Sequence, residues 1–246
     1  RIILTARSNT HFADIDTTRS ITVERDPDHG IVRMRLGAPL EPGTSMGVRF
    51  TVRSRPVHGF RNRARRTPVS HDGSLLFYSD FLPVVGYARG RELDDELARE
   101  DHGLPPRRPG VRRRDDPRGL AEREGQPYAD WVSLDLTIST VADQRAIGQG
   151  ELVEQRADDG RASFRYVTNT PVKLHLGIVS GNYETTEAIY DGHAGPVRIA
   201  IHHMPGHDRN VPQLLSSLKK ALRTLEKRFG PYPYDRLRLV EVSMSD

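Results

Sequence analysis

Residues 210–246, "NVPQLLSSLKKALRTLEKRFGPYPYDRLRLVEVSMSD", form the stretch that decides the fold. Large apolar residues recur there at spacings of three and four, which predicts one helical stripe. The stripe comprises Val211, Leu214, Leu215, Leu218, Leu222, Leu225 and Phe229. Asn210 is the expected N-cap and Gly230-Pro231 the expected end of the helix. The alternation in "RLRLVEVSM" then predicts a buried strand, so the stretch should form a helix followed by a strand.

The sequence before this stretch predicts antiparallel β structure. Apolar residues alternate with polar ones in "SMGVRFTVRS" (45–54), "WVSLDLTIST" (131–140), "VKLHLGIVS" (172–180) and "VRIAIHH" (197–203). Asp159-Gly160 separates two further strand-like runs and predicts a tight hairpin. Many short amphipathic strands without helices between them favour an antiparallel sandwich or saddle. The expected fold class is therefore mainly β, followed by the first β-α-β elements of an α/β domain.

Residues 87–127 interrupt this pattern, because they are rich in Arg, Asp, Glu, Pro and Gly and poor in large apolar residues. We expect an irregular charged insertion there, with one or two helical turns in "ELDDELARE" (92–100).

Composition limits the classes of protein. Hydrophobic residues make up 36% and charged residues 28% of the 246 residues, which suits a polar globular chain. No apolar run approaches about 18 residues, so no transmembrane helix is expected. The net charge is +4, but many arginines alternate with apolar residues along strands, and no nucleic-acid-binding motif is present. We therefore expect no nucleic-acid partner.

The order of several segments resembles the zinc-dependent membrane alanyl aminopeptidase family. The resemblance rests on "PLEPGTSMGVRF" (39–50), on residues 138–184, and on residues 202–242, which end in "FGPYPYDRLRLVEV". The run "GFRNRARRTPVSHDGSLLFYSDFLPVVGY" (59–87), followed by "RELDDE" and "GLPPR", is most similar to the bacterial branch in which this domain follows an ABC transporter permease.

The resemblance implies two domains. Residues 1–196 would form the β saddle that rims the substrate cleft, and residues 197–246 the truncated start of a thermolysin-like catalytic domain. The implied partners are the rest of that catalytic domain and a peptide substrate. The parent would be integral to a bacterial membrane, which this soluble segment would contact only through the parent's transmembrane part, on a side that the resemblance leaves open.

The zinc motif of this family, H-E-x-x-H, places two His ligands and a Glu base on one helix. None of the 10 His residues is followed by Glu. We therefore expect no catalytic residue and no cofactor in this chain, with zinc only in the missing downstream part.

Six residues are candidates for a functional site. Tyr78 and Asp80 occupy the neighbourhood in which the resemblance places a contact to the substrate amine. Glu241, at the end of the last strand, is expected to face the cleft, because ligands gather at the carboxyl ends of strands. His202, His203 and His207 form the nearest metal-like cluster, although His202 and His203 are neighbours on a strand and should point to opposite faces. Each candidate also has a purely structural interpretation.

Two hypotheses about function follow. In the first, the chain is a non-catalytic part of a zinc aminopeptidase-like protein and shapes its peptide cleft. In the second, it is a stand-alone β-sandwich binding module whose last helix packs back on the sheet.

Overall fold

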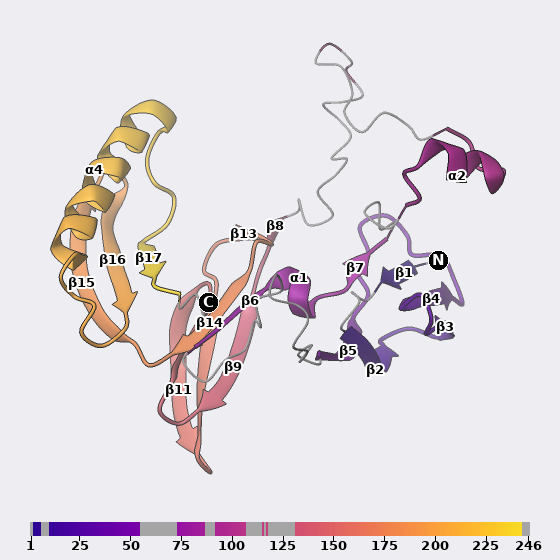
Figure 1. Cartoon of the computed structure of the whole chain (residues 1–246), viewed down its shortest axis with the longest axis horizontal. Helices are drawn as coiled ribbons and strands as arrows, with labels where there is room; N and C mark the ends of the chain where they lie inside the picture. The colour runs from indigo at the N-terminus through magenta and orange to yellow at the C-terminus, as the bar shows by residue number, and fades with distance from the viewer. Residues whose placement is uncertain are drawn as a thin grey trace. The chain divides into compact units, whose positions relative to one another are not determined.

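Figure 1 shows the computed structural model, which describes residues 2–5, 10–54, 73–86, 92–106, 115, 117 and 131–242. The backbone packs as two units, which are described separately below. The first comprises residues 1–57, 77–131 and 173–175, and the second comprises residues 58–76, 132–172 and 176–246. The domain boundary predicted between residues 196 and 197 falls inside the second unit and stays a prediction.

The first unit is a small sandwich of two sheets. The strands are β1 (Ile2–Thr5), β2 (Thr10–Thr17), β3 (Ile21–Asp26), β4 (Ile31–Leu36), β5 (Val48–Ser54) and β7 (Val84–Val85). One sheet has the order β3-β4-β1-β7, and the other pairs β2 with β5. Leu4, Val32 and Met34 are buried, and Phe12 and Val48 from the second sheet pack against them. The core therefore lies between the sheets, as the period of two along each strand requires.

A short helix in the charged insertion is held by a buried arginine. Helix α2 (Glu96–Asp101) confirms the helical turns expected in "ELDDELARE". Arg99 is 5% exposed, and its guanidinium donates to the carbonyls of Leu93 and Pro105 and pairs with Glu92 at 3.0 Å. Apart from residues 92–106, 115 and 117, the predicted insertion (87–127) lies outside the described residues.

The second unit begins with another pair of sheets. Its strands are β6 (Ser74–Phe77, whose last residue is assigned to the first unit), β9 (Asp135–Val141), β10 (Arg145–Ile147), β11 (Glu151–Asp158), β12 (Arg161–Val167) and β14 (Gly177–Gly181). The sheet orders are β11-β12-β9 and β10-β14-β6. The predicted hairpin is confirmed, because Asp158 pairs with Arg161 across Asp159 and Gly160, which have φ values of 44° and 71°.

The single strand predicted for residues 172–180 is wrong. The chain forms two strands there, β13 (Val172–Lys173) and β14, separated by residues 174–176. β13 pairs with β8 (Trp131–Val132), whereas β14 pairs with β10. The chain therefore changes sheets in mid-run, which a continuous apolar alternation does not reveal.

The chain ends in a β-α-β unit, as the sequence predicts. β15 (Glu184–Gly192) and β16 (Gly195–His203) form an antiparallel hairpin, and β17 (Arg236–Val240) pairs with β16 in parallel. Helix α4 (Val211–Phe229) connects β16 to β17 and lies along β15 and β16 (Figure 1). The mainly β fold with antiparallel sheets is thus confirmed.

The face of α4 that packs on this sheet differs from the predicted stripe. Val211, Leu222 and Glu226 are each 4% exposed, whereas Leu225 is 50% and Phe229 is 80% exposed. The buried face of α4 therefore continues from Leu222 to Glu226, one turn later. Leu225 and Phe229 lie outside it. A stripe defined by apolar residues alone misses a buried carboxylate. None of the described helices is long and apolar enough to span a membrane.

Candidate functional site

The two faces of the β15-β16-β17 sheet differ in chemistry. Along β16, Val197 and Ile199 pack against Leu222 of α4 in one apolar cluster. Arg198, Ala200 and His202 alternate with them along the strand and therefore belong to the opposite face. One face is thus covered by the helix, and the other carries polar and charged side chains.

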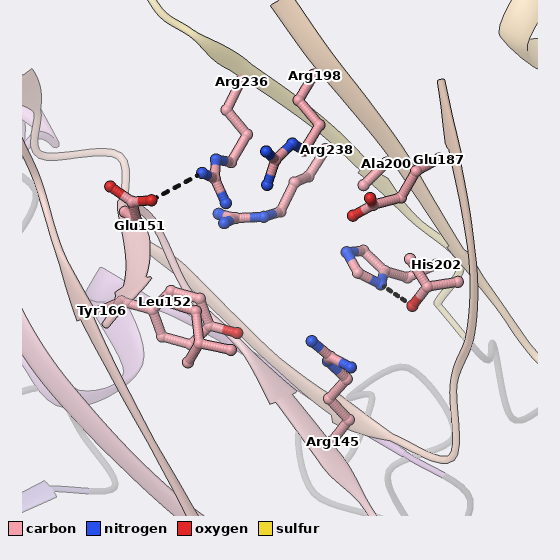
Figure 2. A pocket seen from close by; sticks show the side chains of 11 residues that line it. Arg145, Glu151, Leu152, Tyr166, Glu187, Arg198, Ala200, His202, Arg236 and Arg238 are labelled. Carbon is pink, nitrogen blue, oxygen red and sulfur yellow. Dashed lines mark hydrogen bonds and ion pairs between the residues drawn. The ribbon is translucent and has the colours of Figure 1, made fainter. Parts of the chain in front are cut away.

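The polar face lines a cavity of about 230 Å³. The other wall comes from the sheets of β10, β11 and β12, and all lining residues belong to the second unit (Figure 2). The lining comprises Arg145, Glu151, Leu152, Tyr166, Thr185, Glu187, Arg198, Ala200, His202, Arg236 and Arg238. Four arginines face two glutamates, so the lining is positively charged.

Two of the arginines are held by the opposite wall. Arg236 pairs with Glu151 at 3.2 Å. Arg238 donates to the carbonyls of Gly148 and Gly150 at 3.1 and 2.8 Å, and its guanidinium lies 5.4 Å from the centre of the Tyr166 ring. Burial lowers the pKa of the Arg238 guanidinium, and the charges of Arg236 and Arg145 act in the same direction. These contacts fix β17 against the β11–β12 hairpin.

The backbone structure requires a glycine at position 150 of "GQGELV" (148–153). The segment lacks the third glycine of a dinucleotide-binding loop, so no nucleotide site is expected there. Gly150 has φ +97°, and a Cβ on it would lie 2.5 Å from the Val167 carbonyl oxygen. Only glycine fits this close approach of two backbones. The carbonyls of Gly148 and Gly150 both accept from Arg238.

His202 is buried beside the cavity, with 4% of its surface exposed. Its Nδ1 lies 2.9 Å from Thr185 Oγ1, whereas its Nε2 has no hydrogen-bond partner within the described residues. Burial lowers the His202 pKa to about 4, and the positive charges of Arg145 and Arg238 add to the effect. The imidazole is therefore neutral at pH 7.

Glu241 lies just after β17 and is tied to two segments. Its Oε2 accepts from the Met204 N–H at 2.8 Å, and its Oε1 lies 2.6 Å from His207 Nδ1. Burial acts to raise the pKa of Glu241, but the hydrogen bonds from Met204 and His207 outweigh it and lower that pKa. The Tyr183 hydroxyl donates to the Glu241 carbonyl, and burial together with the Glu241 charge raises the Tyr183 pKa to about 12. About a third of the Glu241 side chain, 35%, remains exposed.

The three histidines of the predicted cluster contact separate partners. His202 contacts Thr185, whereas the next residue, His203, contacts Thr186 with its Nε2 at 3.3 Å. These partners are consecutive on β15, which places the two rings on opposite faces of the sheet. His207 pairs with Glu241 instead. No group of three His, Asp or Glu side chains able to hold a metal occurs in the described part of the chain.

Tyr78 and Asp80 belong to helix α1 (Tyr78–Phe81), in the first unit. Asp80 Oδ2 accepts from the Phe77 N–H at 2.8 Å, a contact that caps the helix. The Tyr78 ring lies edge-on to His175, with centroids 5.8 Å apart. Both side chains thus have a structural role, while their predicted contact to a substrate amine stays a prediction.

Comparisons with known proteins point to one fold. No protein-family model and no curated protein matches the chain. Among solved structures, an M1 zinc metallopeptidase from Deinococcus radiodurans has a TM-score of 0.66 at 15% identity, over 99% of this chain and 48% of that one. A mutant of that organism's enzyme bound to a Tyr-Ser-Ala substrate gives 0.65 at 16% identity, over 99% and 49%. Aminopeptidase A of Legionella pneumophila, in complex with aspartic acid, gives 0.61 at 12% identity, over 98% and 24%.

These likenesses establish a shared fold along nearly the whole chain. The chain spans about half the length of the Deinococcus structures and 24% of the Legionella structure. The predicted fold class, a saddle-like β region followed by β-α-β elements, therefore agrees with the fold that these metallopeptidases share with the chain.

The arginines around the cavity were missed by sequence reasoning. Arg198 lies in "VRIAIHH", and Arg236 and Arg238 lie in "RLRLVEV", where alternation marks them as the polar side of a strand. Such positions usually face water. That three of them share one cavity depends on the parallel register of β16 and β17, which places Arg198 opposite Arg236. The alternation in the sequence indicates that these arginines lie on the polar face of the sheet. Only the register between β16 and β17 shows that they lie close together.

Proposed function

We propose that the chain is the N-terminal, cleft-shaping part of a zinc metallo-aminopeptidase-like protein and has no peptidase activity by itself. The observation that carries the proposal is the likeness of fold along 99% of the chain to an M1 zinc metallopeptidase of about twice its length. The order of segments that resembles the aminopeptidase family supports it independently.

In this proposal the β region borders the substrate and the β-α-β unit begins the catalytic domain. The rest of that domain is the partner of the chain and binds the zinc, and the substrate is a peptide. Among the three proposed substrate contacts, Glu241 is favoured by its place just after β17 and by the 35% of its side chain that stays exposed. Tyr78 and Asp80 are the proposed contacts from the first unit. The parent carries a permease that anchors it in a bacterial membrane.

The first test is an activity assay of the purified 246-residue chain with aminoacyl nitroanilides and added zinc. We expect no turnover above that of buffer, because the chain contains no H-E-x-x-H motif. Hydrolysis that is abolished by a chelator would show that the chain holds its own zinc site, and the proposal would fall.

The second test is the sequence of the parent gene. We expect an H-E-x-x-H motif encoded after Asp246 and several membrane spans encoded before Arg1. A gene with neither feature contradicts the proposal.

One observation favours the alternative of a stand-alone binding module. Helix α4 already buries Leu222 against Val197 and Ile199 of its own sheet. Hydrogen exchange separates the two cases. A truncated catalytic domain predicts fast exchange in residues 210–242, and a complete module predicts protection equal to that of β12.

A further inference from the structure

The cavity between the two walls of the second unit gathers more positive than negative charge. Of its two carboxylates, Glu151 pairs with Arg236 at 3.2 Å. Arg145 and Arg198 form no ion pair among the described residues. The register of β16 and β17 sets Arg198 directly opposite Arg236, an arrangement in which like charges repel. A bound anion would remove this repulsion.

Two buried nitrogens, unpaired among the described residues, also belong to residues that line the cavity. His202 Nε2 is buried and has no partner in the described chain, and the same is true of Arg145 Nε. Thr185 Oγ1 lies 2.9 Å from His202 Nδ1. When the threonine hydroxyl donates to Nδ1, the proton of the neutral ring sits on Nε2, which then donates toward the cavity. Leaving such donors unpaired costs free energy, and a ligand that only accepts hydrogen bonds satisfies both.

The donors approach from different directions. Figure 2 shows the guanidinium groups of Arg198, Arg236 and Arg238 on one side of the cavity, with Arg145 extending from β10 on another. His202 lies between these two groups in the same view. A planar carboxylate uses donors in one plane, whereas a tetrahedral oxyanion accepts from several sides.

We propose that this cavity binds a phosphate group, either as inorganic phosphate or as the phosphate of a small metabolite. Four arginines and two glutamates give the lining a net charge of +2 with His202 neutral, which matches a phosphate dianion. A volume of about 230 Å³ has room for the ion and a small organic remainder. The site lies within the second unit alone. It rests on the contacts and charges of its lining residues and not on the peptidase proposal.

Calorimetric titration of the full chain tests the site. Inorganic phosphate, glycerol phosphate and acetate are titrated separately at constant ionic strength, because free salt screens arginines. We expect saturable binding of phosphate at one site per chain. Comparable binding of glycerol phosphate identifies a phosphate ester as an acceptable source, and binding of inorganic phosphate alone identifies the free ion. Acetate that binds as tightly as phosphate, or no saturable phosphate binding, overturns the proposal.

Two variants locate the binding. Arg198→Gln removes an exposed cavity arginine that makes no ion pair in the described residues, so the fold should persist. We expect its phosphate affinity to fall at least about tenfold, equivalent to about 1.4 kcal/mol. Arg35→Gln, an equal loss of charge on β4 of the first unit, is the matched control and should bind as the unchanged chain does. Equal weakening in both variants would show a non-specific charge effect and contradict the site.

A measurement on the unchanged chain does not rely on any variant. The ring nitrogens of His202 are followed by NMR during the phosphate titration. We expect the Nε2 signal to shift with the same saturation as the calorimetric heat, because that nitrogen gains an acceptor. Phosphate binding that leaves this signal in place puts the ion elsewhere and overturns the proposal.

Discussion

His202 makes one set of contacts through its backbone and another through its ring. Its backbone carbonyl accepts from the Glu241 N–H at 2.8 Å, which extends the contact between β16 and the end of β17. Its ring lies edge-on to Tyr183, with centroids 6.4 Å apart, and lines the arginine cavity. The backbone of His202 therefore takes part in strand pairing, while its ring lines the cavity.

This burial predicts acid sensitivity. The His202 pKa is about 4 in the folded chain against an ordinary value of about 6.5. Between these values the unfolded state binds more protons, so stability falls as pH drops from 6.5 to 4 and is unaffected above that window. We expect urea unfolding to show a steeper fall in the unchanged chain than in His202→Gln, by up to about 1.4 kcal/mol per pH unit. Parallel stability profiles in the two proteins would contradict this.

The sequence predicted individual residues only where local rules apply. The opposite faces of His202 and His203 follow from strand geometry, and the left-handed conformation of Gly160 follows from hairpin chemistry. The pairing of His207 with Glu241 joins residues 34 positions apart. No local pattern encodes such a contact, because it depends on how β16 and β17 are brought together.

At the scale of elements, α4 depends on a buried carboxylate as well as on apolar packing. Glu226 Oε2 accepts from the Tyr190 hydroxyl at 2.7 Å. Its Oε1 accepts from the N–H groups of His193 and Tyr232 at 3.2 and 3.1 Å. One side chain thus fastens the helix to the β15–β16 turn and to the segment that leads into β17. These hydrogen bonds, that of Tyr190 first, lower the Glu226 pKa.

Removal of this carboxylate should loosen the β-α-β unit. Glu226→Ala leaves three donors without an acceptor, and we expect the melting temperature to fall by roughly 5 °C or more. Glu226→Gln is the matched control, since its carbonyl can accept from both N–H groups and its amide can donate to Tyr190. Thermal unfolding followed by circular dichroism measures both. Equal loss in the two variants would mean that the negative charge matters rather than the hydrogen bonds.

Helix α2 should depend on Arg99 in a similar way. The helix has six residues, too few to be stable alone, and the Arg99 guanidinium joins it to Leu93 and Pro105 on either side. Arg99→Lys keeps the charge but loses the planar fork of donors. We expect proteases that do not cleave at Arg or Lys, such as chymotrypsin, to cut this variant within residues 92–106 several times faster than the unchanged chain. Arg35→Gln serves as the control, and unchanged cleavage in Arg99→Lys would show that the charge alone suffices.

The order of elements was more predictable than their interruptions. Periodicity identified β5, β16, α4 and β17, because the apolar residues of each recur at the spacing of that element. It missed the break between β13 and β14, where a change of sheet occurs without a change of pattern. It also extended the apolar face of α4 to Phe229, since the rule counts apolar residues and not their partners.

At the scale of the whole chain, each unit has a hydrophobic core of its own. Met34 is fully buried in the sandwich of the first unit, while Ile199 is fully buried beneath α4 in the second. The two clusters share no residue. Local stability should therefore be set separately in each unit.

Core substitutions test this separation. Met34→Ala removes a fully buried side chain and should destabilise the first unit by about 2–5 kcal/mol. We expect hydrogen exchange to accelerate in β1, β3 and β4, with no change in β16 and α4. A similar acceleration in both units would show that they unfold together, and Arg35→Gln controls for the effect of a surface change.

The open side of β17 has a consequence for handling the protein. Within the described residues β17 pairs only with β16, so its other edge offers backbone groups that can template a strand from another molecule, apart from the Arg236 carbonyl, which accepts from the Tyr232 hydroxyl. The chain carries a net charge of +4, so two approaching copies repel each other. Salt weakens that repulsion. Light scattering should therefore show self-association that increases with ionic strength, and the chain should stay monomeric longest in dilute buffer.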